Sequence, residues 1–71
     1  MLLTVSEKLR LMLRRKDMTL GELADATGQS RQNLSNKMTR DNFSEKEIYQ
    51  IAEVLGCSVE IIFRMPDGTE I

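Results

Sequence analysis

Apolar residues recur along this chain at the three- and four-residue spacing of amphipathic helices. In three places a serine or threonine stands three residues before a glutamate, and an apolar-periodic run follows. The pairs are Thr4 and Glu7, Thr19 and Glu22, and Ser44 and Glu47. In such a capping box the hydroxyl accepts a hydrogen bond from the third amide of a helix, and the glutamate accepts one from the amide of the capping residue. The boxes therefore predict where three helices begin.

The full pattern predicts four helices in one small domain of 71 residues, over about residues 5–15, 20–27, 31–38 and 45–55. Ser30 is the expected cap of the third helix, and Gly28 and Gly56 are expected to end the second and fourth. The residues expected to point inward are Val5, Leu9, Met12, Leu13, Leu20, Leu23, Ala24, Leu34, Met38, Ile48, Ile51, Ala52 and Leu55.

The pattern changes in residues 58–71. β-Branched and aromatic side chains precede the turn sequence Met-Pro-Asp-Gly, which favours a short β-hairpin. A fifth helix capped by Ser58 is the alternative, although Ile61 stands where a capping box would place glutamate. Since an isolated hairpin is marginal in water, we expect it to pair with a second copy or to lie against the helices. The residues expected to form a dimer contact are Val59, Ile61 and Phe63.

The predicted third helix is unusually polar, because Leu34 and Met38 are its only apolar residues. A packed helix usually uses about three of every seven positions for its buried face. Gln32 and Asn36 lie opposite those two residues, and amide side chains can pair with adenine in the major groove. Two helices joined by a short turn containing Gly28 match the helix-turn-helix, whose second helix enters that groove. The pattern thus predicts a DNA-reading face.

The net charge of −1 conceals an asymmetry along the chain. Residues 1–40 hold eight basic and four acidic groups, whereas residues 41–71 hold two basic and seven acidic groups. Because the local field decides where a polyanion docks, the first half can bind DNA despite the overall balance.

Composition argues against catalysis and against metal or cofactor binding. The chain has no histidine, and its single cysteine, Cys57, cannot form an internal disulfide or a cysteine-rich zinc site. No carboxylate pair, nucleophile–base set or glycine-rich phosphate loop is present. We therefore expect a protein that is not an enzyme and has no cofactor. The apolar opening Met-Leu-Leu is too short for a signal peptide or a membrane span, so we expect a cytoplasmic protein with no membrane partner.

From the first predicted helix to Phe63, the chain resembles the Cro and phage-repressor (XRE-type) helix-turn-helix family of small transcriptional regulators. The segments that carry the resemblance are TLGELADATG (19–28), SRQNLSNK (30–37) and IAEVLGCSVEIIF (51–63). It implies an all-α fold, a compact four-helix lambda-repressor-like domain, with the C-terminal segment as a short β-hairpin or a fifth helix.

The resemblance also implies which residues contact DNA. The base contacts would be Arg31, Gln32, Ser35 and Asn36. The phosphate contacts would be Lys16, Thr19, Ser30, Asn33, Lys37 and Arg40. The chain departs from the family pattern at three positions. Leu20 replaces a glutamine that holds a phosphate, Gln29 stands at a turn position that is more often Val or Ile, and Lys37 replaces an apolar residue.

Two interpretations of function follow. The first is a repressor-like transcriptional regulator that binds operator-like double-stranded DNA sequence-specifically, as a homodimer on a palindromic site. The second is an antitoxin-like or accessory protein-interaction module on the same scaffold, which the acidic second half supports. A continuous positive surface around the third helix would favour the first.

Overall fold

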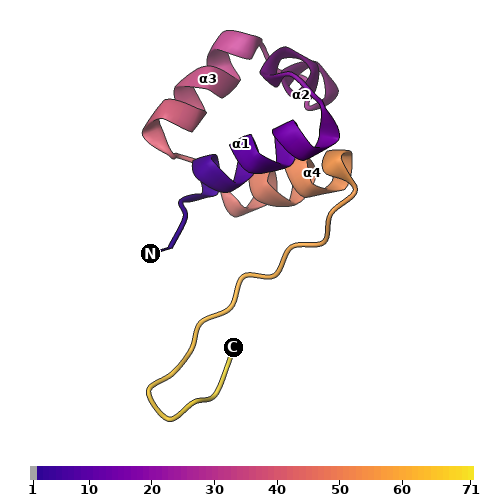
Figure 1. Cartoon of the computed structure of the whole chain (residues 1–71). Helices are drawn as coiled ribbons and strands as arrows, with labels where there is room; N and C mark the ends of the chain where they lie inside the picture. The colour runs from indigo at the N-terminus through magenta and orange to yellow at the C-terminus, as the bar shows by residue number, and fades with distance from the viewer. Residues whose placement is uncertain (1) are drawn as a thin grey trace.

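The computed structural model describes residues 2–71 and contains four helices followed by an extended tail (Figure 1). The helices are α1 (Val5–Lys16), α2 (Leu20–Ala26), α3 (Arg31–Arg40) and α4 (Glu45–Leu55). They gather around one core, and the tail leaves the end of α4 and runs away from them (Figure 1). The predicted all-α fold class is confirmed. None of the helices in the described residues has the length and apolar character that a membrane span requires.

Every helix begins at a hydroxyl side chain. The hydroxyl oxygens of four residues each accept a hydrogen bond from the backbone N–H three positions later. These residues are Thr4, Thr19, Ser30 and Ser44. In α1, α2 and α4 a glutamate completes the capping box, as the sequence predicts. These caps satisfy amide groups that the first turn of a helix cannot pair internally.

Every helix also ends in the same way, with a left-handed residue followed by a backbone bond that spans the last turn. The left-handed residues are Asp17 (φ 53°), Gly28 (φ 71°), Asp41 (φ 51°) and Gly56 (φ 70°). The N–H of the residue after each donates to a carbonyl five positions earlier, at 2.9–3.0 Å, which is the Schellman motif. The sequence indicated the two glycines. The two aspartates bear a Cβ that the left-handed conformation disfavours.

The core consists of side chains that the periodicity places inward. The fully buried apolar residues are Leu9, Leu13, Leu23, Ala24, Leu34, Met38, Ile51, Ala52 and Leu55. Leu23, Leu34 and Leu55 are the largest of those with less than 2% exposure. In α3 only Leu34 and Met38 are buried, as predicted.

A buried polar contact links the start of α1 to the end of α3. Ser6 is 5% exposed, and its backbone N–H donates to Oδ1 of Asp41 at 2.9 Å. Its hydroxyl lies 2.8 Å from both Asp41 Oδ1 and the carbonyl oxygen of Met38, so these two acceptors share its proton. The Asp41 carboxylate thus supports the N-terminus of α1, where the helix dipole favours negative charge. The contact fastens the far end of α3 to α1.

The tail ends in a tight hairpin and contains no fifth helix. Phe63 and Ile71 exchange two backbone hydrogen bonds of 2.9 Å, and Arg64 and Glu70 form an antiparallel bridge. The Gly68 N–H donates to the carbonyl oxygen of Met65 at 2.9 Å, and the Met65 N–H donates to that of Thr69 at 2.8 Å. This is a three-residue hairpin loop around Pro-Asp-Gly. The pairing begins only at Phe63, and the hairpin stands away from the helices (Figure 1).

We expect substitution of the two left-handed aspartates by glycine to change the stability of the fold in opposite directions. Asp17→Gly relieves the disfavoured conformation and should raise the free energy of unfolding by about 0.5–1 kcal/mol. Asp41→Gly relieves the same conformation but leaves the buried Ser6 donors without their carboxylate. It should lower the free energy of unfolding by about 1–2 kcal/mol. Urea unfolding of both variants measures this, and a change of the same sign in both would contradict the role assigned to Asp41.

Candidate nucleic-acid interface

The exposed face of α3 carries two amide side chains that are bonded to each other. Gln32 and Asn36 are both exposed, on the side of the helix opposite the buried Leu34. Gln32 Nε2 donates to Asn36 Oδ1 at 3.0 Å. This bond leaves Gln32 Oε1 as an acceptor and both hydrogens of Asn36 Nδ2 as donors. An adenine presents the complementary donor and acceptor, N6 and N7, in the major groove.

A chain of hydrogen bonds joins the start of α3 to the end of α2. Gln29, in the turn, donates through Nε2 to the Thr27 hydroxyl at 2.9 Å. Its Oε1 accepts from Asn33 Nδ2, also at 2.9 Å. The Thr27 hydroxyl lies 2.9 Å from the carbonyl oxygen of Leu23. The sequence shows Gln29 as a departure from the family pattern and assigns it no role. In the structure its side chain orients Asn33.

Arg31 passes over the start of α2. Its Cδ lies 3.6 Å from the position that a Cβ on Gly21 would occupy, and the Thr19 hydroxyl oxygen lies 3.9 Å from the same point. A Cβ at Gly21 would therefore make only ordinary van der Waals contact with the arginine stem. The structure thus places a predicted base contact, Arg31, close to a predicted phosphate contact, Thr19.

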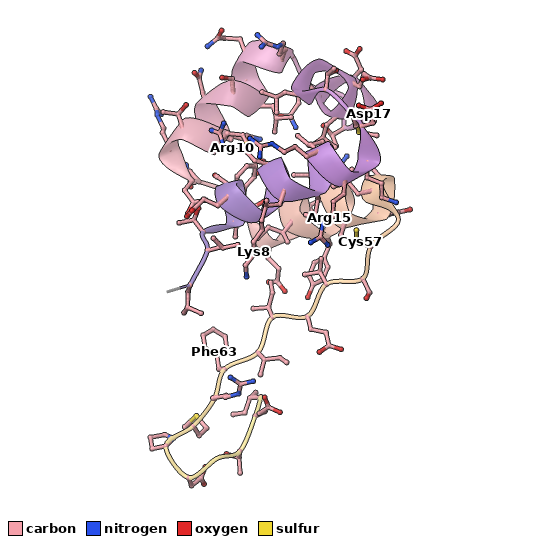
Figure 2. All side chains as sticks on the ribbon, in the orientation of Figure 1. Lys8, Arg10, Arg15, Asp17, Cys57 and Phe63 are labelled. Carbon is pink, nitrogen blue, oxygen red and sulfur yellow. The ribbon has the colours of Figure 1, made fainter. Side chains whose placement is uncertain are left out.

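The flank of α3 that bears Ser35 faces basic residues of α1. A shallow groove of about 270 Å³ is lined by Arg10, Leu13, Arg14, Leu20, Ser35 and Met38. Ser35, a predicted base contact, therefore lies beside two arginines of α1. Arg10 is seen in Figure 2 on the α3 side of α1. Positive charge consequently extends from α3 onto α1 on this flank.

Lys37 is held by an acidic residue on the flank that faces α4. Its Nζ forms an ion pair with Oε2 of Glu47, and each side chain is 27% exposed. Oε1 of Glu47 accepts the capping hydrogen bond from the Ser44 N–H at 3.3 Å. The hydrogen bond from Lys37 is the largest influence that lowers the pKa of Glu47 below its ordinary value of 4.5. Only one other side-chain ion pair occurs in residues 2–71, between Arg64 and Glu70 in the tail.

The remaining predicted phosphate contacts occupy different surroundings. Ser30 is engaged as a cap, because its hydroxyl accepts from the Asn33 N–H at 3.0 Å. Arg40 is exposed in the last turn of α3. Lys16 extends to the end of α4, with its Nζ 3.9 Å from the position of a Cβ on Gly56. The carbonyl end of that helix favours a cation. The contacts of these residues with DNA stay predictions.

Comparison with known proteins agrees with this geometry. The family model of the Cro/C1-type HTH DNA-binding domain matches residues 8–67, a range that contains α2, α3 and α4 and most of the tail. The resemblance inferred from the sequence is therefore confirmed. No curated protein and no solved structure matches the chain.

The ion pair predicts a specific pH dependence. Because the pKa of Glu47 is lowered in the folded chain, the pair stabilises the fold above the ordinary glutamate pKa, and this contribution is lost as the pH falls through the folded pKa. Glu47→Gln removes this titration and retains an amide oxygen for the cap. The free energy of unfolding should therefore decrease less steeply in the variant than in the wild type between about pH 5 and pH 2. Identical slopes in acid-dependent denaturant melts would contradict this.

Proposed function

This chain belongs to the Cro/C1-type helix-turn-helix family of DNA-binding domains, and we propose that it is a repressor-like regulator of transcription that reads double-stranded DNA with α3. The observation that carries the proposal is the exposed Gln32–Asn36 pair opposite the buried Leu34. A helix that buries two residues of ten leaves the rest of its surface for a partner. The unpaired donor and acceptor of these amides suit a base edge.

In this proposal the base edges are contacted from the outer face of α3 and the phosphates from its two flanks. The base contacts are Arg31, Gln32, Ser35 and Asn36. The phosphate contacts are Lys16, Thr19, Ser30, Asn33 and Arg40, and Lys37 joins them when it is released from its ion pair with Glu47. Arg10 and Arg14 add positive charge beside Ser35, which suits a phosphate backbone on that flank.

We further propose that two copies bind a palindromic site through their tails. Residues 60–71 are exposed throughout. The tail's large exposed apolar residues are Ile61, Ile62, Phe63, Met65 and Ile71. An open groove of about 280 Å³ between α1, α4 and the start of the tail continues this apolar surface. Because a lone hairpin is marginal and such exposed apolar surface marks an interaction site, a second tail is the partner that we assign to it.

Sequence reading by α3 can be tested by random-site selection with the purified protein. Gln32→Ala and Asn36→Ala should each relax the preference at one or two base positions, by about 1–3 kcal/mol of discrimination. Arg40→Ala should weaken binding to all sequences alike and reduce the salt slope by about one. If the wild type enriches no sequence and binds DNA without a steep salt dependence, the accessory-module interpretation replaces this one.

The proposed dimer can be tested with a matched pair of exposed apolar residues. Phe63 in the tail is 69% exposed and Leu11 on α1 is 43% exposed. Phe63→Ser should raise the dimer dissociation constant at least about tenfold, because an aromatic anchor dominates a small interface. Leu11→Ser, which lies outside the tail and its groove, should leave the constant unchanged. Sedimentation equilibrium measures both, and a monomeric wild type would overturn the proposal.

A further inference from the structure

Glu47 pairs with the ammonium group of Lys37, whose positive charge α3 would otherwise offer to a phosphate. The basic residues of α3 are Arg31, Lys37 and Arg40. Within residues 2–71, Lys37 is the only one of them with a carboxylate inside salt-bridge distance. Glu47 also places a negative charge on the flank of α3 that a phosphate backbone would approach. The pair therefore opposes phosphate binding in two ways.

The capping box of α4 restrains the Glu47 carboxylate. Its Oε1 accepts the Ser44 N–H at 3.3 Å, and its own N–H donates to the Ser44 hydroxyl at 3.2 Å. The carboxylate is thus held at the start of α4, while Lys37 reaches it on a flexible four-carbon stem. Both side chains are 27% exposed, so the pair is screened by salt less than a fully exposed pair.

We propose that Glu47 is an attenuating residue, which holds Lys37 against α4 and lowers the affinity for DNA of any sequence. This inference rests on the proposed function. Released from Glu47, Lys37 would neutralise one further phosphate, and each phosphate contact changes the salt slope by about 0.9. Glu47 would therefore set how tightly the protein holds non-specific DNA, without a contact to a base.

The test uses the full chain and a matched control. Glu47→Gln removes one negative charge and keeps an acceptor for the cap. Glu7→Gln does the same in the capping box of α1, where the glutamate bonds to Thr4 and no basic partner lies within salt-bridge distance in the described residues. Binding to a duplex of random sequence is measured against salt concentration for both variants. The same salt titration is made for Lys37→Ala and for the double variant Lys37→Ala/Glu47→Gln. Circular dichroism checks that each variant is folded.

We expect Glu47→Gln to bind about three- to tenfold more tightly at low salt, with a slope steeper by about 0.9. Glu7→Gln should change affinity by less than about twofold. In the Lys37→Ala background the Glu47→Gln gain should largely vanish, because there is no lysine to release. The free energy of unfolding of the Glu47→Gln single variant should meanwhile fall slightly through loss of the ion pair. Affinity for DNA and stability should therefore change in opposite directions.

The inference is overturned if Glu47→Gln binds no more tightly than the wild type. It is equally overturned if the gain persists undiminished with Lys37→Ala, since the glutamate would then act only through the general field. A wild type that binds no duplex DNA would instead remove the proposed function itself. The two failures are therefore distinguishable.

Discussion

The burial of Leu34 is the contact on which the rest of α3 depends. Its side chain is 0% exposed, and with Met38 it supplies all the buried apolar surface of a ten-residue helix. Asparagine, serine and threonine are weak helix formers, so α3 cannot rely on its own composition. Tertiary packing at Leu34 holds the helix on the domain, and it does so with a footprint narrow enough to leave the opposite face free.

Polar contacts supply what the narrow apolar face lacks. At its start, α3 is tied to the turn and α2 by the Asn33–Gln29 bond. At its end, Asp41 binds Ser6 of α1, and on its flank Lys37 binds Glu47 of α4. The helix is thereby attached to each of the other three by side chains outside its reading face. These contacts can fix the orientation of α3 without using the side chains that would contact the bases. A helix that reads DNA needs both a fixed orientation and free polar side chains.

Local features of this fold could be predicted from the sequence, and contacts between distant residues could not. Caps such as Ser44 and stops such as Gly28 depend on neighbours within one turn, so their residue types identify them. The Pro-Asp-Gly turn of the tail is local in the same sense. Ser6 and Asp41 are 35 positions apart, and the local pattern around neither residue predicts their contact. The left-handed Asp41 was missed because aspartate is also an ordinary turn residue.

The candidate site shows the same division, which explains why its scaffold was easier to predict than its chemistry. The periodicity identifies which residues of α3 face outward, because two buried positions fix the rotation of a helix. It cannot identify which outward residues are free, since that depends on the helices packed beside it. Lys37 illustrates this, because its side chain is committed to Glu47 on α4. At Leu20 a neighbouring helix adds charge instead of removing it. Leu20 itself offers no polar group where the family has glutamine. The charge beside it comes from Arg10 and Arg14 of α1. The polarity of this interface is therefore set by neighbouring helices as much as by the helix-turn-helix itself.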